Sequence, residues 1–212
     1  MVIAIDGPAG AGKSSVARKL AARLGFTYLD SGAMYRCVAL TCLEWGADPE
    51  QSGEATSTAE SIGISFEDGD VLIDGVDVSE EIRSPEVTEA ASKVAVHPGV
   101  REAMVIEQRR MIATGRYVAE GRDIGTVVSP DSPLKVFLTA RPEVRAERRA
   151  EETGGDPREI LVAQLERDRR DTEREHGALK TADDAVEIDT SDLGLDRVVD
   201  RVAALAAKRG LV

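Results

Sequence analysis

Short apolar runs alternate along this chain with stretches whose apolar positions recur at helical spacing. The first run, residues 2–6, is apolar up to its last residue and contains two isoleucines, which predicts a buried strand. We expect four more core strands at residues 26–29, 117–120, 134–138 and 185–189. Helical patterns predict helices at residues 15–24, 33–45, 85–96, 98–113, 142–152, 157–174 and 195–208. This alternation predicts an α/β fold, a doubly wound five-stranded parallel sheet with helices on both faces.

One region interrupts the alternation of strands and helices. Residues 64–67 and 71–74 alternate in polarity and flank Asp68-Gly69-Asp70, which predicts an antiparallel hairpin with another short strand after Gly75. We therefore expect one domain over residues 1–212 that carries a small inserted α+β subdomain at about 52–99. Gly154-Gly155 separates two predicted helices and predicts the hinge of a short lid at about 148–158.

The first predicted strand leads directly into the sequence Gly-Pro-Ala-Gly-Ala-Gly-Lys-Ser, and a predicted helix follows it. This is G-x-x-x-x-G-K-S in the strand–loop–helix context of a P-loop, and that context argues against a chance match. Glycines let backbone N–H groups surround phosphate oxygens, Lys13 reaches the β- and γ-phosphates, and Ser14 offers a hydroxyl to Mg²⁺. The residues expected to bind a nucleoside triphosphate are Gly7, Pro8, Ala9, Gly10, Ala11, Gly12, Lys13, Ser14 and Ser15.

Charge and composition narrow the possible partners and the compartment. The formal net charge is -12, which argues against nucleic acid and acidic membranes as partners. The only two cysteines, Cys37 and Cys42, fall on one predicted helix, and their spacing suits neither a facing pair nor a metal site. We expect both to be reduced and the protein to be cytoplasmic, because Met1 leads straight into the first strand and no apolar run approaches the length of a membrane span.

Residues 141–174 contain nine arginines and no lysine. Many acids accompany them, so one interpretation is a pair of solvated helices with ion pairs at helical spacing. The exclusive use of arginine also fits planar, two-pronged contacts with phosphate.

Several further motifs together resemble the bacterial cytidylate kinases, a family of P-loop nucleoside monophosphate kinases. They are Asp-Ser-Gly-Ala-Met-Tyr-Arg at residues 30–36, Gly-Arg-Asp-Ile-Gly-Thr-Val-Val at 121–128 and Arg-Asp-Arg-Arg-Asp at 167–171. They occur in the order that the family has, and the resemblance spans nearly the whole chain. It implies a monomeric kinase of pyrimidine nucleotide metabolism that transfers the γ-phosphoryl group of ATP, with Mg²⁺, to CMP or dCMP. The inserted subdomain would then bind CMP.

The resemblance also implies a role for individual residues. Arg36 and Arg122 would hold the acceptor phosphate, and Arg148 and Arg149 would reach the transferring phosphoryl group together with Lys13. The other residues implied to surround CMP are Ser31, Tyr35, Ser92, Arg101, Asp123, Arg167, Asp171 and Arg174; of these, Ser92, Arg101 and Asp123 would read cytosine. This chain has Glu120 where many relatives have Asp, and the extra methylene changes the reach of that carboxylate.

Three alternative functions can be weighed against the one that the resemblance implies. The nearest alternative is a related kinase with another acceptor, such as UMP or AMP. A GTPase-like switch is disfavoured because the chain has no asparagine and so no N-K-x-D sequence. A nucleic-acid motor fits poorly with the net charge of -12.

Overall fold

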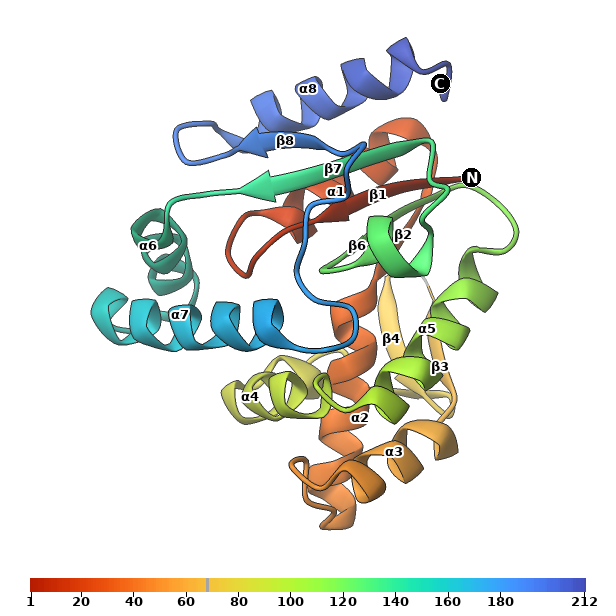
Figure 1. Cartoon of the computed structure of the whole chain (residues 1–212), viewed down its shortest axis with the longest axis vertical. Helices are drawn as coiled ribbons and strands as arrows, with labels where there is room; N and C mark the ends of the chain where they lie inside the picture. Colours follow the sequence, from red (N-terminus) through yellow and green to blue (C-terminus); the bar gives the residue numbers. More distant parts are fainter. Residues whose placement is uncertain (68) are drawn as a thin grey trace. The chain divides into compact units, whose positions relative to one another are not determined.

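The structure is a computed structural model that describes residues 1–67 and 69–212. It divides into two compact units (Figure 1). The first unit combines Met1–Asp30 with Met111–Val212, and the second is the continuous segment Ser31–Arg110. The insertion predicted at about 52–99 falls within the second unit.

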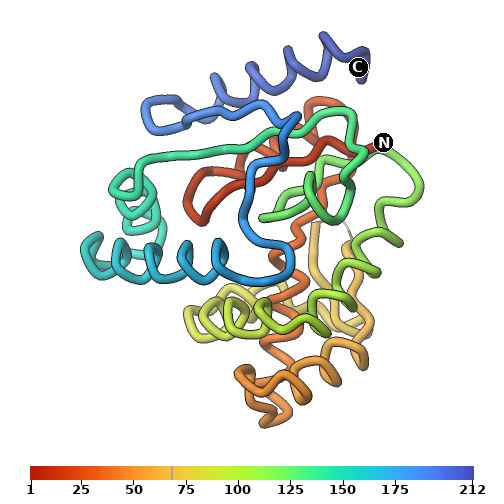
Figure 2. The backbone as a smooth tube through the Cα atoms, viewed as in Figure 1, coloured from red at the N-terminus to blue at the C-terminus, as the bar shows by residue number. Residues whose placement is uncertain are grey.

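A five-stranded parallel sheet forms the centre of the first unit. Its strands, in spatial order, are β2 (Thr27–Asp30), β6 (Tyr117–Gly121), β1 (Val2–Asp6), β7 (Leu134–Thr139) and β8 (Val186–Asp189). All five residues of β1 are buried, because β6 and β7 flank it on its two sides. Figure 2 shows the sheet assembled from both ends of the chain, with red β1 between the later, green strands. The predicted sheet is confirmed, and each strand begins or ends within one residue of its expected bounds.

The helices of the first unit are α1 (Lys13–Leu24), α6 (Pro142–Thr153), α7 (Pro157–Glu173) and α8 (Leu195–Lys208). Apolar side chains of α1 and α8, among them Leu20 and Val202, share one core with Ile3 and Ile5 of the sheet. Helix α1 begins two residues earlier than predicted, within the Gly-Lys-Ser sequence itself. One turn of π-helix, η2 (Ile124–Val128), follows β6 and has no signal in the sequence pattern.

The second unit contains α2 (Ser31–Trp45), α3 (Ser52–Ser61), α4 (Pro85–Val94), most of α5 (Pro98–Ile112), the short helix η1 (Glu81–Arg83) and a three-stranded antiparallel sheet. The sheet consists of β3 (Ile64–Glu67), β4 (Asp70–Ile73) and β5 (Val76–Asp77), which confirms the predicted hairpin and third strand. Asp68 of the predicted turn lies outside the described residues.

Helix α3 was not expected, because its sequence is rich in Ser, Thr and Gly. It buries Ala55, Thr58 and Ala59 within the second unit, so packing outweighs a weak intrinsic helix propensity.

Two further observations concern the cysteines and the length of the helices. Cys37 and Cys42 are both buried and form no disulfide with each other. Within residues 1–67 and 69–212, no helix is long and apolar enough to cross a membrane.

Candidate active site

The loop between β1 and α1 forms a backbone-lined cradle in the first unit. A Cβ at Gly7, where φ is +148°, would lie 2.1 Å from the carbonyl oxygen of Leu138, so only glycine fits there. Gly12 has φ +86° and nothing within 4 Å of an added Cβ, so this side of the loop is open. An open, glycine-rich loop at a helix N-terminus fits a phosphate chain.

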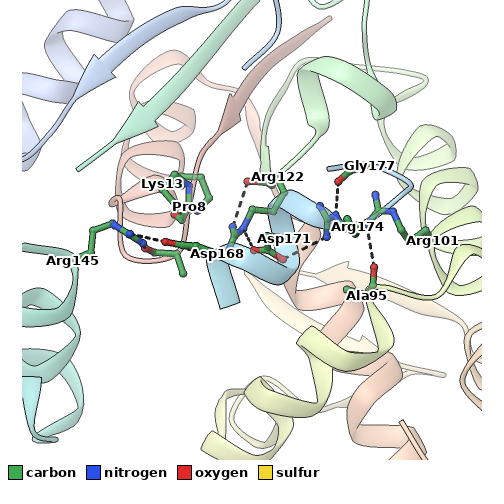
Figure 3. Close-up of polar contacts among 12 residues, drawn as sticks. Pro8, Lys13, Ala95, Arg101, Arg122, Arg145, Asp168, Asp171, Arg174 and Gly177 are labelled. Carbon is green, nitrogen blue, oxygen red and sulfur yellow. Dashed lines mark hydrogen bonds and ion pairs between the residues drawn. The ribbon is translucent and has the colours of Figure 1, made fainter. Parts of the chain in front are cut away.

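Lys13 places its ammonium inside this loop. The residue is buried, and its Nζ donates a hydrogen bond of 2.8 Å to the carbonyl oxygen of Pro8 (Figure 3). Burial, together with the positive charge of Arg122, lowers the pKa of Lys13 to about 7, and the carboxylate of Glu120 opposes that change. A phosphate anion in the cradle would favour the charged ammonium strongly.

Glu120 ends β6 close to the loop and is buried. The hydroxyls of Tyr28 and Ser14 donate hydrogen bonds to its carboxylate. Burial and the nearby charge of Asp30 raise its pKa, whereas Lys13 and the two hydroxyls oppose the rise. Sequence reasoning left Glu120 without a partner and missed Tyr28, whose strand β2 pairs directly with β6.

Arg122 forms a compact charged cluster with three predicted residues near the C-terminal end of α7. They are Arg167, Asp171 and Arg174. The Nε atom of Arg122 donates to Oδ2 of Asp171 at 2.8 Å, and Arg174 lies 3.6 Å from the other carboxylate oxygen (Figure 3). Burial works against ionisation of Asp171, but the charges of Arg122, Arg167 and Arg174 hold its pKa below the usual value. The structure therefore brings three predicted arginines together around the buried carboxylate of Asp171.

The two arginines predicted for the lid have other contacts in this structure. Arg148 donates to the hydroxyl and carbonyl oxygens of Thr190 at 3.1 and 2.6 Å. Arg149 forms an exposed ion pair of 3.1 Å with Glu152 on the same helix. Arg145, which sequence reasoning did not distinguish from its neighbours, is the arginine of α6 that contacts the phosphate-binding loop, at the carbonyl oxygen of Ala9.

Asp6, the last residue of β1, anchors the segment that follows Arg122 and Asp123. Its two carboxylate oxygens accept hydrogen bonds from the backbone N–H groups of Ile124 and Gly125 at 2.8 and 2.7 Å. Burial, to which the charge of Asp123 adds, raises the pKa of Asp6 to about 6 despite these hydrogen bonds. Asp6 therefore links the start of the phosphate-binding loop to the segment that carries Arg122.

The raised pKa of Asp6 leads to a prediction about how the free energy of unfolding depends on pH. Its folded pKa of about 6 lies above the ordinary value of 3.8, so the folded state binds this proton more tightly. The free energy of unfolding therefore loses up to about 3 kcal/mol as pH rises from 4 to 6 through this one group. We expect Asp6→Asn to lack that component of the slope, measured by urea unfolding at several pH values. If the free energy of unfolding of Asp6→Asn depends on pH as steeply as that of the wild type, the raised pKa of Asp6 is wrong. A constant difference in stability between the two proteins does not affect this comparison.

The predicted residues of the second unit lie on α2, α4 and α5. Ser31 and Tyr35 are buried on α2, and the guanidinium of Arg101 on α5 lies 5.7 Å from the centre of the Tyr35 ring. Arg101 also donates to the carbonyl oxygen of Ala95 at 3.5 Å. Tyr35 and Arg101 are thus brought together.

The other two predicted residues of this unit lie on α2 and α4. Arg36 is half-buried on α2, next to Tyr35 in sequence. Ser92 is buried on α4 and donates to the carbonyl oxygen of Glu89 at 2.9 Å.

The sequence model of the cytidylate kinase family matches residues 3–208 of this chain. The chain belongs to that family. A cytidylate kinase of Rhodococcus opacus is 48% identical over 219 residues, covering 99% of this chain and 96% of its own. One from Pelotomaculum thermopropionicum is 50% identical over 212 residues, covering 95% and 94%. The family resemblance expected from the motifs is confirmed.

Solved structures support the fold. A gluconokinase from Sinorhizobium meliloti superposes with a TM-score of 0.53 at 18% identity, over 98% of this chain and 91% of that one. A shikimate kinase from Bacteroides thetaiotaomicron gives a TM-score of 0.52 at 13% identity, over 98% of both chains. These likenesses establish the α/β fold and, at such low identity, nothing about activity or substrate.

Proposed function

We propose that this chain transfers the γ-phosphoryl group of ATP to CMP or dCMP, yielding ADP and CDP or dCDP, within pyrimidine nucleotide metabolism. The observation that carries the proposal is the buried Lys13 in an open glycine loop, close enough to the Arg122–Asp171 cluster for their charges to affect its pKa. Membership of the cytidylate kinase family supports the choice of acceptor.

The donor nucleotide would be held by the loop of residues 7–15. Lys13 would follow the γ-phosphoryl group, and Ser14 would offer its hydroxyl to Mg²⁺, which supplies charge neutralisation of the phosphates when bound. Among the described residues, no group of three or more His, Cys, Asp or Glu side chains forms a metal cluster. A single hydroxyl with the carboxylate of Glu120 beside it fits Mg²⁺, since this ion takes most of its ligands from water and substrate phosphates.

The residues expected to hold the acceptor lie on several helices and on the segment after β6. Arg36 and Arg122 would bind the phosphate of CMP, and Asp171 with Arg167 and Arg174 would surround its ribose and phosphate. Ser92, Arg101 and Asp123 would read the cytosine edge, since a carboxylate accepts a hydrogen bond from the N4 amine and a guanidinium donates to N3 and O2. Ser31 and Tyr35 would line the same nucleotide.

The attacking atom is a phosphate oxygen that is already an anion, so the reaction requires no general base. The main obstacle is repulsion between two polyanions, and positive side chains offset it and stabilise charge on the transferring group. Lys13 and Arg122 would take this role, and Arg148 and Arg149 would join them when both nucleotides are bound. Closure around both nucleotides would exclude water and so prevent hydrolysis of ATP.

A panel of nucleoside monophosphates tests the proposal. We expect coupled ADP release with CMP and dCMP to exceed that with UMP, AMP or GMP by about 10²-fold or more in kcat/KM, because a mismatched base leaves buried polar groups unpaired. ATP alone, without an acceptor, is the control for hydrolysis. A preference for UMP or AMP would mean that the chain is a related kinase with that acceptor. No turnover with any acceptor would overturn the proposed function.

A further inference from the structure

Two carbonyl groups of the phosphate-binding loop are held from outside the loop. The carbonyl oxygen of Ala9 accepts a hydrogen bond of 2.8 Å from Nη1 of Arg145. The carbonyl oxygen of Ala11 accepts one of 3.2 Å from the hydroxyl of Thr190. Both side chains are buried polar groups that the proposed reaction does not otherwise use.

Arg145 is fixed in place by all three of its guanidinium nitrogens. Besides its contact with Ala9, it donates from Nη2 to the carboxylate of Asp168 on α7 at 2.6 Å and from Nε to the carbonyl oxygen of Ala140 at 3.2 Å (Figure 3). Its side chain is only 4% exposed. Helix α6 approaches the loop so closely that a Cβ at Gly10 would lie 3.0 Å from that of Arg145. The arginine is therefore a rigid contact between α6, α7 and the loop.

Thr190 is fixed by a second arginine of the same helix. Nη1 of Arg148 donates to the hydroxyl oxygen of Thr190 at 3.1 Å, and Nη2 donates to its carbonyl oxygen at 2.6 Å. Because Arg148 donates to the hydroxyl oxygen, the single hydroxyl proton remains available, and the carbonyl oxygens of Ala11 and Thr139 share it at 3.2 and 3.0 Å. Helix α6 thus controls both external contacts of the loop.

The orientation of these carbonyls determines the orientation of two N–H groups. In a trans peptide, the C=O and the N–H of the next residue point in opposite directions. Turning the Ala9 carbonyl towards Arg145 turns the N–H of Gly10 away from α6. Turning the Ala11 carbonyl towards Thr190 orients the N–H of Gly12 in the same manner. Both glycines have positive φ, which allows the chain to take this form.

We propose that Arg145 and Thr190 are positioning residues that pre-orient the Gly10 and Gly12 amides for the phosphates of ATP, and that α6 thereby couples the lid region to the loop. This inference rests on the proposed function for the identity of the ligand. The energetic advantage is that the amides need no reorganisation when the nucleotide binds.

Enzyme kinetics provide the first test. We expect Arg145→Lys, which keeps the charge but loses two of the three contacts, to raise the KM for ATP and the Kd of ADP by about tenfold. The KM for CMP should change by less than about twofold. Arg141→Lys is the matched control, because Arg141 precedes the same helix and forms an exposed two-pronged ion pair with Asp192. It should leave both KM values unchanged.

Two variants of Thr190 provide a second test. Thr190→Val removes the hydroxyl at nearly constant size, and Thr190→Ser keeps it. Valine should weaken ADP binding and serine should restore it. In the nucleotide-free protein, we expect valine to lower the NMR order parameter of the Gly12 amide from about 0.85 to below about 0.6, with α8 unaffected. If Arg145→Lys fails to fold, the two Thr190 variants still test whether these side chains position the loop amides.

The outcomes separate this inference from the proposed function. Equal changes in the KM values for ATP and CMP, or a lowered Tm with unchanged KM values and order parameters, would make Arg145 and Thr190 purely structural residues. A wild-type protein that phosphorylates no nucleoside monophosphate would overturn the proposed function. The order parameters would still test the loop by themselves.

Discussion

We expect Lys13→Met to lower kcat by about 10³-fold or more while the protein remains folded. The ammonium of Lys13 lies inside the glycine loop, and in the proposed reaction it follows the charge on the γ-phosphoryl group. Removing such preorganised charge typically costs several kcal/mol of transition-state stabilisation. The fold should survive, because burial already lowers the pKa of this ammonium and an apolar side chain of similar length removes that cost. Steady-state turnover of CMP and circular dichroism together measure the two effects.

Lys19→Met is the matched control for this experiment. Lys19 lies on the same helix and forms an exposed ion pair with Asp196, so its loss should change neither turnover nor folding appreciably. Near-normal kcat in a folded Lys13→Met protein would contradict the proposed phosphoryl-transfer mechanism.

The second large effect is expected for Arg122→Lys. Lysine keeps the positive charge beside Asp171, so that buried carboxylate is not left unpaired. It loses the planar fork, which in the proposed reaction holds the phosphate of CMP by two parallel hydrogen bonds. We expect kcat/KM for CMP to fall by about 10²–10³-fold, since such charge-assisted bonds contribute about 1.5–3 kcal/mol each. The Kd of ADP should change by less than about threefold.

An exposed arginine provides the comparison. Arg23 pairs with Asp200 at the surface of the first unit, and Arg23→Lys should leave both CMP use and ADP binding unaltered. If Arg122→Lys weakens ADP binding and CMP use by the same factor, Arg122 belongs to the donor site.

Most of the fold could be predicted from the sequence because its signals are local. The order of strands and helices follows from apolar runs and spacings. In α4, Ser84 accepts a hydrogen bond from the N–H of Val87 and Pro85 occupies the first position, a local arrangement that favours a helix start. Helix α3 could not be predicted in this way, because its buried face consists of small residues that give no apolar period. The π-helical turn η2 is held by the distant carboxylate of Asp6, a contact that no local pattern encodes.

The candidate site rests on the same kind of local signal. Motifs singled out Lys13 and Arg122 as candidates because glycines and arginines at fixed spacing have a recognisable chemistry. Tyr28 and Arg145 were missed, since each acts through a partner remote in sequence, Glu120 or Ala9. In a run of nine arginines, only the three-dimensional structure distinguishes the one that contacts the loop.

The position of β1 in the sheet has a consequence for how the chain folds as it leaves the ribosome. Ile3 pairs with Val118 on one side and with Leu134 on the other, so the strand is made long before either neighbour and cannot pair until the whole second unit between them has also been made. The second unit is continuous in sequence and can complete its own contacts in the meantime. The apolar β1 stays exposed throughout that interval, and such non-local pairing is slow. During synthesis, this apolar strand therefore needs protection from aggregation until β6 and β7 have been made.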